Sequence, residues 1–375
     1  MDKISLTLFF TAGVSLEAWA AAGNLDRELT LYKKLLPHLK KISLVTYGGK
    51  SDREFSSHIE DLRLLCVPWQ RWQQLTALHL TAKYFPQLSA ADVLKTNQIR
   101  GAQVPIWLKK IFRKKLIVRC GFLHGYFTRQ QGADEKRIQE AVSLERTAFT
   151  DADLCVVTSA WQKEAVVKDY GIAPGKIKVI PNYVVTGMFK PDPGIEKKFD
   201  LVFIGRGDRQ KNLPNLFEAL NILKNKGRRY SLRLVGACCE SDDLRREAQA
   251  KGLDVTFSGN VPNFQLPAVL NEAQVFILPS LYEGHPKALL EAMSCGLPCI
   301  GAEVPGIREE IRHESNGWLC RTDPESLATA IETVLGNEAL RKILGENARK
   351  HVVGNYDIDR IVELELEALR EVVQK

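Results

Sequence analysis

The sequence predicts an α/β protein built from two doubly wound domains, and three features of the chain support this. Its 375 residues exceed the roughly 250 to 300 at which one hydrophobic core stops growing. Short apolar runs alternate with helical patterns along the chain, as in parallel sheets covered by helices on both faces. The alternation breaks at residues 190–198 (KPDPGIEKK), where two prolines and a glycine stand among charged residues, and then restarts. We therefore expect two such domains facing each other across a cleft.

The first domain is expected over residues 1–189. Its predicted strands are the apolar runs Ile4–Phe10, Ile42–Thr46, Leu64–Val67, Leu116–Cys120 and Leu154–Thr158. The helical patterns between them include Leu25–Leu39, Trp72–Tyr84 and Glu135–Phe149. A capping box at Ser159–Gln162 starts a further helix that ends near Gly171.

The second domain is expected over residues 190–356. Its predicted strands are Phe199–Gly205, Ser231–Val235, Val255–Phe257, Gln274–Leu278, Pro298–Gly301 and Gly317–Cys320. A last helix, Ile358–Val373, has no strand after it. We expect this C-terminal segment, residues 357–375, to pack back across the domain junction.

Composition narrows the class of protein. A hydrophobic share of 45% and a charged share of 26% are ordinary for a globular chain. The cysteines form no Cys-x-x-Cys pair and stand mostly in apolar runs, which favours reduced, buried thiols and a cytoplasmic protein. No run reaches 18 apolar residues, and the first segment lacks a signal-peptide pattern, so we expect no membrane span. The net charge of +7 suits nucleotides, lipid headgroups or nucleic acid alike.

Two carboxylates mark the most informative stretch, Pro279–Gly296 (PSLYEGHPKALLEAMSCG). A buried strand leads into it, and a helix is expected over Pro286–Cys295, whose N-terminus would form an anion site. Glu283 then lies in the loop before the helix. A loop carboxylate there is costly unless it binds something, which favours a binding site.

Glu291 has two interpretations. It shares a helical face with Lys287 and Ser294, so all three can belong to a solvated stripe with a Lys287–Glu291 pair. Alternatively this face looks into the cleft, where the carboxylate can accept hydrogen bonds from both hydroxyls of a ribose.

A basic loop follows the first strand of the second domain. Arg206 and Lys211 come after Gly205, just before a helix that opens near Asn212, so both can reach one diphosphate. The alternative is a solvated basic loop. The segment lacks the third glycine of G-x-G-x-x-G, and the chain has no G-x-x-x-x-G-K-[ST], which disfavours dehydrogenases and ATPases.

The first domain offers fewer candidates. Gly13, in the loop TAGVS, either lets the backbone approach a ligand or is an ordinary turn glycine. His124 follows a strand at its cleft end and is either a binding residue or a structural histidine. Asp151 and Asp153 fit a turn better than a metal site, because they stand at the start of a strand. No His/Cys/Asp cluster has ligand spacing, so we predict no bound metal and no cofactor.

Residues 103–119 (QVPIWLKKIFRKKLIVR) contain six Lys or Arg residues and no acidic residue. Trp107, Leu108, Ile111 and Phe112 are spaced as one helical face. Such a basic amphipathic helix is typical of a peripheral contact with the inner face of an anionic membrane. The same pattern also fits a helix that packs on the sheet.

With these residues in view, the chain resembles the family 4 (group 1) glycosyltransferases, which have the GT-B fold of two Rossmann-like domains. The resemblance spans most of the second half, through the ordered motifs FIGRGDRQKN, FSGNVPN, ILPSLYEGHPKALLEAMSCGLPCIG, VPGIREEI and NGWL. The junction resembles the family in VVTSAWQKEAVVKDYGI and KIKVIPNYV. The Glu-x7-Glu spacing of Glu283 and Glu291 is the most specific marker.

The resemblance implies a role for each candidate. Arg206 and Lys211 would neutralise the donor diphosphate, Glu283 would hold the donor sugar, and Glu291 would hold the ribose. The other residues that it places around the substrates are Gly205, Val261, Tyr282, Gly284, His285 and Lys287, with Gly13 and His124 from the first domain.

The expected activity is that of a retaining hexosyltransferase. It would move a sugar from a UDP-, GDP- or ADP-sugar to an acceptor glycan, lipid or small molecule without a metal, and we expect no nucleic-acid partner. The alternatives are a nucleotide-sugar epimerase of the same fold and a non-catalytic basic protein that binds membranes or nucleic acid.

Overall fold

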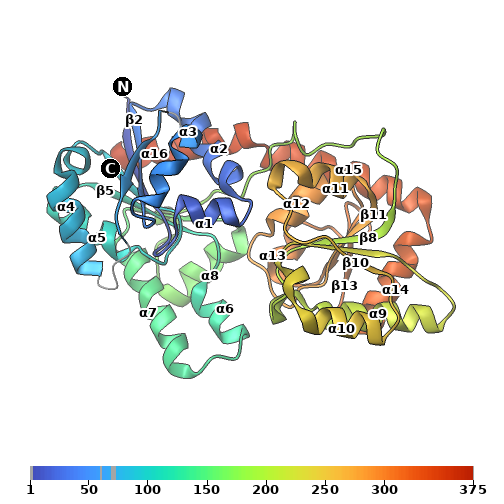
Figure 1. Cartoon of the computed structure of the whole chain (residues 1–375). Helices are drawn as coiled ribbons and strands as arrows, with labels where there is room; N and C mark the ends of the chain where they lie inside the picture. The colour runs from blue at the N-terminus through green and yellow to red at the C-terminus, as the bar shows by residue number, and fades with distance from the viewer. Residues whose placement is uncertain (1–2, 60, 69–72, 375) are drawn as a thin grey trace. The chain divides into compact units, whose positions relative to one another are not determined.

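The computed structural model describes residues 3–59, 61–68 and 73–374, and it divides into two compact units (Figure 1). The first unit comprises Met1–Pro181 together with Asp359–Lys375, and the second comprises Asn182–Ile358. Each unit contains its own parallel β-sheet. The predicted pair of Rossmann-like α/β domains is therefore confirmed.

The sheet of the first unit has the order β3-β2-β1-β4-β5-β6-β7. Its strands are β1 (Ser5–Phe9), β2 (Lys41–Thr46), β3 (Arg63–Cys66), β4 (Val93–Thr96), β5 (Lys115–Cys120), β6 (Leu154–Val157) and β7 (Ile177–Val179). Its helices are α1 (Leu16–Ala21), α2 (Leu25–Leu35), α3 (Ser56–Ile59), α4 (Gln73–Ser89), α5 (Gln103–Phe112), α6 (His124–Gln130), α7 (Glu135–Asp151), α8 (Ala160–Tyr170) and α16 (Ile358–Gln374). The chain order reverses between β1 and β4, so right-handed crossovers place helices on both faces.

Two strands of this sheet, β4 and β7, were not predicted. In β4, Lys95 interrupts the apolar run, yet its side chain is only 1% exposed because it pairs with Glu365 of α16. Arg119 of β5 reaches the same carboxylate at 3.4 Å. These contacts hold α16 on the sheet of the first unit. β7 has only three residues, too few for a periodic pattern.

The predicted helix boundaries in this unit are mostly close to those observed. The side chain of Ser159 accepts a hydrogen bond from the N–H of Gln162 at 3.2 Å, and Gly171 ends α8 with φ +68°. The helix predicted from Trp72 to Tyr84 runs instead from Gln73 to Ser89, with a kink at Tyr84, and Trp72 lies outside the described residues.

The sheet of the second unit has the order β10-β9-β8-β11-β12-β13. Its strands are β8 (Phe199–Ile204), β9 (Leu232–Val235), β10 (Val255–Phe257), β11 (Ala273–Leu278), β12 (Cys299–Ala302) and β13 (Trp318–Cys320), as predicted within two residues. Its helices are α9 (Leu213–Asn225), α10 (Asp242–Ala250), α11 (Leu266–Asn271), α12 (Lys287–Ser294), α13 (Pro305–Arg308), α14 (Pro324–Leu335) and α15 (Glu338–Tyr356). The order reverses between β8 and β11, so the loops after these two strands meet at one edge.

Residues 190–198, predicted as a linker, lie within the second unit, eight residues beyond its first residue. The N–H of Asp192 donates to Asn271, and that of Lys198 donates to the carbonyl of Glu272 at 2.7 Å. These bonds tie the segment to the end of α11 and the start of β11.

All eight cysteines are free and buried, as their apolar surroundings predicted.

Candidate functional site

The candidate site lies where the loops after β8 and β11 meet. The two loops are joined through Gln210, whose carbonyl accepts from the N–H of Leu281 at 2.8 Å. The Gln210 side chain donates to the carbonyl of Tyr282 at 2.9 Å. The basic loop and the loop of Glu283, 72 residues apart in sequence, are therefore one structure.

Glu283 is a buried carboxylate with three donors. Lys211 donates to Oε1 at 2.5 Å and Ser280 donates to the same oxygen at 2.7 Å, while Gln210 reaches Oε2 at 3.3 Å. The side chains of Lys211 and Glu283 are only 13% and 7% exposed. Sequence reasoning gave these two residues separate tasks, whereas the structure places them in one ion pair.

Arg206 is held less tightly. Its side chain is 66% exposed and contacts Asp208 at 3.1 Å and Gln210 at 3.2 Å. Gly205 precedes it at a crowded point, since a Cβ there would come 2.9 Å from the Phe203 ring. The loop backbone is thus fixed while the guanidinium stays accessible.

Glu291 is only 3% exposed, so the solvated-stripe interpretation is wrong. The amide of Asn263 donates to its Oε1 at 3.0 Å. Ser294, on the same face of α12, is fully buried and donates to the carbonyl of Phe189 at 2.6 Å. Sequence reasoning missed Asn263. The motif FSGNVPN contained the signal, because Asn263 stands two residues after the predicted base neighbour Val261, which is half-buried.

His285 was predicted to bind substrate, and the structure gives its side chain another task. The ring is 1% exposed, its Nδ1 accepts from the N–H of Asn182 at 3.2 Å, and its Nε2 lies 3.0 Å from Glu310. Both ring nitrogens are therefore used inside the protein. The Asn182 amide also donates to the carbonyl of His285, so the side chain positions the loop rather than reaching into the site.

Glu310 anchors this cluster. It is 2% exposed and also accepts from His351, at 3.4 Å, and from Tyr356. Burial raises the pKa of a carboxyl group, but at Glu310 the effects of His285, His351 and Tyr356 outweigh it and the pKa falls to about 2. Sequence reasoning quoted Glu310 within VPGIREEI but gave it no role.

The backbone between Glu283 and α12 faces a close neighbour. A Cβ at Gly306 would lie 2.1 Å from the carbonyl oxygen of Gly284, so only a glycine fits there. Within the described part of the chain, the N–H groups of Gly284 and His285 have no acceptor. These donors precede α12, whose first residue is Lys287, so its N-terminus and the loop present N–H groups together. The ring of Tyr282, in contrast, is buried.

In the first unit, Gly13 lies at the corresponding edge of the sheet. It is exposed, has φ +81°, and follows β1. The neighbouring Ala12 donates to the carbonyl of Arg100 at 3.0 Å, and Gly101 approaches Ala12 so closely that a Cβ would lie 2.9 Å from its nitrogen. The loops after β1 and β4 therefore meet here. Gly13 remains a prediction as a ligand contact.

His124 is the first residue of α6. Its backbone N–H and that of Gly125 donate to the two oxygens of Glu145, which also accepts from Tyr170. Burial, assisted by the positive charge of Arg100, lowers the pKa of His124. Its Nε2 is buried and has no partner among the described residues. The role of the His124 ring remains a prediction.

The turn predicted for Asp151 and Asp153 is confirmed only for Asp153, which lies in a bend before β6, because Asp151 is still the last residue of α7. Asp153 accepts from the N–H of Leu116 at 2.7 Å and pairs with Lys109 at 2.8 Å. Asp151 ends α7 and lies 3.6 Å from Lys110. Both carboxylates therefore fasten the start of β5 and the end of α5.

The stretch 103–119 contains a helix and a strand, since α5 ends at Phe112 and β5 begins at Lys115. Leu108 is fully buried, while Trp107 and Ile111 are 48% and 53% exposed. The single apolar face predicted from sequence is therefore wrong. One side of α5 packs on the sheet and another remains exposed.

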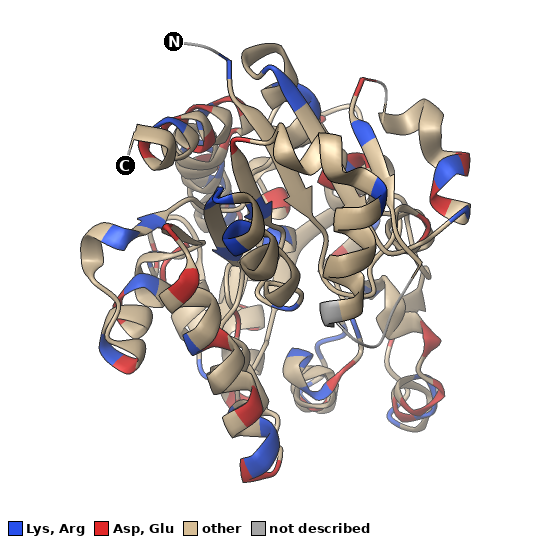
Figure 2. Cartoon of the chain, turned by 90° about the vertical axis from the view of Figure 1, so that its left-hand side faces the viewer, with Lys and Arg blue, Asp and Glu red and all other residues tan. Residues whose placement is uncertain are grey.

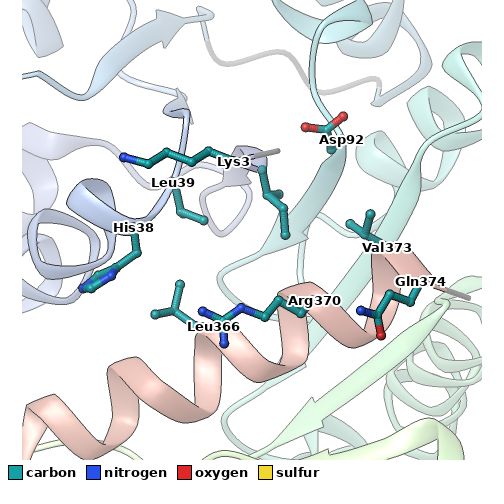
Figure 3. Close-up of a pocket in the computed structure, with 9 residues that line it drawn as sticks. Lys3, His38, Leu39, Asp92, Leu366, Arg370, Val373 and Gln374 are labelled. Carbon is teal, nitrogen blue, oxygen red and sulfur yellow. The ribbon is translucent and has the colours of Figure 1, made fainter. Parts of the chain in front are cut away.

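A separate cavity of about 370 Å³ lies at the opposite edge of the first sheet (Figure 3). Lys3, His38 and Arg370 surround it, with Leu366 of α16 beside them. Asp92, another lining residue, accepts from the N–H of Ser5 at 2.8 Å. Because it adjoins the amino ends of β1 and β4, this cavity is not at the ligand-binding edge of the sheet.

Comparison with known families and proteins follows the same division of the chain. The model described as "Glycosyl transferases group 1" matches residues 188–351, and that described as "Glycosyl transferase 4-like domain" matches residues 41–183. An uncharacterized glycosyltransferase of Methanocaldococcus jannaschii is 29% identical over 65% of this chain and 64% of its own length.

A second relative is the Escherichia coli UDP-Gal:alpha-D-GlcNAc-diphosphoundecaprenol alpha-1,3-galactosyltransferase. It is 30% identical over 54% of this chain and 56% of its own length. The chain thus matches between about half and two thirds of the length of these relatives.

Two solved structures share the fold. HepE of Anabaena, in complex with UDP and glucose, superposes with a TM-score of 0.78 at 19% identity, over 98% of this chain and 99% of that one. The sucrose-phosphate synthase of Thermosynechococcus elongatus gives a TM-score of 0.79 at 22% identity, over 99% of both chains. At these identities the likeness shows the fold alone.

Proposed function

The chain belongs to the group 1 glycosyltransferases of the GT-B fold, and on this premise we propose that it transfers a hexose from a nucleoside-diphosphate sugar to an acceptor. The observation that carries the proposal is the buried pair of Lys211 and Glu283 beside the exposed Arg206. It stands at the edge of the second sheet where the strand order reverses, the usual ligand position in such sheets.

The donor diphosphate is assigned to Arg206, Lys211 and the N–H groups before α12. The Lys211 ammonium has three N–H donors and donates one to Glu283, so the other two can bind a phosphate oxygen while the ion pair stays intact. Negative charge develops on the departing diphosphate, and preorganised donors stabilise it in the transition state. Because these cationic and N–H donors can stabilise that charge themselves, we propose a metal-independent reaction.

Glu291 is assigned to the ribose. The Asn263 amide fixes Oε1, and a fixed carboxylate can accept hydrogen bonds from vicinal hydroxyls without further ordering. Val261, near Asn263 in sequence, is assigned to the base. HepE and the E. coli relative are named with UDP or UDP-Gal, so UDP-sugars come first among the UDP-, GDP- and ADP-sugars to test.

We assign retention of anomeric configuration to the reaction. Both oxygens of Glu283 are occupied by donors and one of them by a lysine, an arrangement that suits charge placement rather than nucleophilic attack. Attack from the face of the departing diphosphate then gives retention.

The acceptor is a glycan, a lipid or a small molecule. The buried free cysteines support a cytoplasmic site of action.

The test is product analysis by NMR. The protein is incubated with UDP-, GDP- and ADP-sugars and a panel of acceptors, and the coupling constant of the new anomeric proton reports the configuration. An α-linked product from an α-linked donor is expected, and turnover is lost in Arg206→Ala and Lys211→Ala. Near-normal turnover in either folded variant would contradict the assignment of Arg206 and Lys211 to the donor diphosphate. Isomerised donor formed without an acceptor would instead identify an epimerase.

A further inference from the structure

Helix α4 exposes apolar side chains along one side. Leu75 and Leu78 are 52% and 65% exposed, and Ala82, a helical turn beyond Leu78, is exposed too. Residues at this spacing lie on one helical face. Leu80 and Leu88 are fully buried, so α4 already has a different face in the core. The exposed apolar residues are therefore not needed for packing within the described unit.

Helix α5 continues this surface. Trp107 and Ile111, one turn apart, are about half exposed, at 48% and 53%. The ring of Phe85, at the end of α4 and 55% exposed, meets the ring of Phe112 edge-on with centroids 5.5 Å apart. The two helices pack directly on each other. We call the exposed side chains of Leu75, Leu78, Phe85, Trp107 and Ile111 the α4–α5 face.

Positive charge surrounds the α4–α5 face. Between residues 73 and 119 the only acidic residue is Asp92, which is engaged with the N–H of Ser5. Lys83, Lys110 and Arg113 are exposed on the same two helices or directly after them, and the Lys110 side chain is 67% exposed although it lies 3.6 Å from Asp151. Figure 2 views the chain from the side on which α4 and α5 are seen in Figure 1, with basic residues in blue. Apolar side chains with a tryptophan, bordered by cations, match the boundary between acyl chains and anionic headgroups.

We propose that the α4–α5 face docks on an anionic lipid bilayer. The leucine, isoleucine and phenylalanine side chains enter the acyl boundary, Trp107 lies at the headgroup level, and Lys83, Lys110 and Arg113 contact lipid phosphates. An acceptor embedded in the bilayer would then be delivered to the enzyme. Docking itself does not depend on sugar transfer, so its test is separate from that of the reaction.

The experiment is co-sedimentation of the full chain with unilamellar vesicles. Phosphatidylcholine vesicles are compared with vesicles in which roughly a third of the lipid is the anionic phosphatidylglycerol. Binding to the anionic vesicles is expected, with weaker binding at high salt. Leu78→Ser/Trp107→Ser should lower the partition coefficient at least about tenfold, since both side chains lose apolar burial. Lys83→Ala/Lys110→Ala should lower it about fivefold and reduce the salt dependence.

Matched controls come from the second unit. Ile343 is 53% exposed on α15 and Lys342 is exposed beside it, so Ile343→Ser and Lys342→Ala remove the same kinds of group elsewhere. Both should bind vesicles as the wild type does. Circular dichroism and melting temperature confirm that each variant is folded, and Trp107→Phe serves if the double variant is not.

Three outcomes would overturn the proposal. The first is no binding to anionic vesicles, and the second is an equal loss in the control and α4–α5 variants. The third is a wild-type dimer on size exclusion that dissociates in Leu78→Ser/Trp107→Ser, which would make the face an interface between two copies of this chain.

Discussion

The edges of the two sheets differ in how fully their polar groups are held. In the second unit, Glu283 and Glu291 each accept from a side chain of another loop, Lys211 and Asn263 respectively. In the first unit, Gly13 is exposed and His124 has a ring nitrogen without a partner among the described residues. The second unit therefore holds its two carboxylates in fixed contacts, whereas the first unit leaves Gly13 exposed and the His124 ring nitrogen unpartnered within the described residues. If the second unit binds the donor as we propose, its donor site is preorganised by the protein.

The largest effect is expected from Lys211→Ala. Turnover should fall roughly 100- to 1000-fold, because a preorganised cation is lost at the departing diphosphate. The change also leaves Glu283 buried without its cation, which should lower the free energy of unfolding by about 3 to 5 kcal/mol. Steady-state kinetics and urea unfolding measure the two effects.

A second variant separates folding from chemistry in that experiment. Lys211→Ala/Glu283→Gln removes the buried charge together with its partner, so part of the stability should return while turnover stays low. If turnover returned together with stability, Lys211 would be a structural residue, and the preorganised donor side would lose its main support.

Glu310→Gln tests the cluster that positions the donor loop. The pKa of Glu310 lies at about 2 in the folded protein, below its ordinary value near 4.5. A depressed carboxyl pKa stabilises the fold above about pH 4.5, and this contribution, about 3 kcal/mol, is lost as the pH falls toward 2. The variant should therefore melt lower than the wild type at pH 6, with a smaller difference at pH 3.

The exposed Glu338, also in the second unit, supplies the control. Glu338→Gln should melt as the wild type does at both pH values. An equal decrease in melting temperature for Glu310→Gln at pH 6 and pH 3 would contradict the role given to its charge.

Glu291→Ala should weaken the binding of the nucleotide roughly 10- to 100-fold, since hydrogen bonds to a charged group contribute about 1.5 to 3 kcal/mol. Isothermal titration calorimetry measures this. The loss should be the same for the nucleoside monophosphate as for the diphosphate, because Glu291 is assigned to the ribose. Ser294→Ala, on the same face of α12, should leave nucleotide affinity unchanged. A loss confined to the diphosphate would move Glu291 to the phosphates.

The smallest effect on nucleotide affinity is expected in the first unit. His124→Asn should change the dissociation constant of the nucleoside diphosphate by less than about twofold. His124 lies in the first unit, whereas the nucleotide is assigned to the second unit. Its effect on transfer should appear as a change in the KM of the acceptor. A tenfold loss of nucleotide affinity would show that the two edges do not divide the substrates as we propose.

Sequence reasoning located the candidate loops because their signals are local. An apolar strand followed by Gly205 or Pro279, and then by charged residues and a helix start, is readable within 20 residues. It failed where partners are distant in sequence. Strand β4 was not predicted because Lys95 interrupts its apolar run. The sequence does not reveal that Glu365, 270 residues away, pairs with this lysine and allows it to be buried. His285 looked available because Asn182, 103 residues earlier, could not be seen to occupy its ring.

The prediction of a single apolar face on α5 was wrong for a related reason. Periodicity showed that the helix is amphipathic, but the neighbours decided which side is buried. Leu108 packs inward, while Trp107 and Ile111 remain exposed together with the side of α4 that shows Leu78. The spacing of apolar residues on one helix does not reveal that a second helix extends the same surface.

The most direct test of the account is a calorimetric titration of the wild type and of Arg206→Ala/Lys211→Ala with UDP, GDP and ADP. We predict that the wild type binds one of these nucleotides more tightly than the other two, and that the variant loses at least about 2 kcal/mol of that binding energy, the contribution of charge-assisted hydrogen bonds to the diphosphate. Absence of binding by the folded wild type to all three, or equal affinity in the variant, would contradict the claim that the loops after β8 and β11 hold a nucleoside-diphosphate sugar.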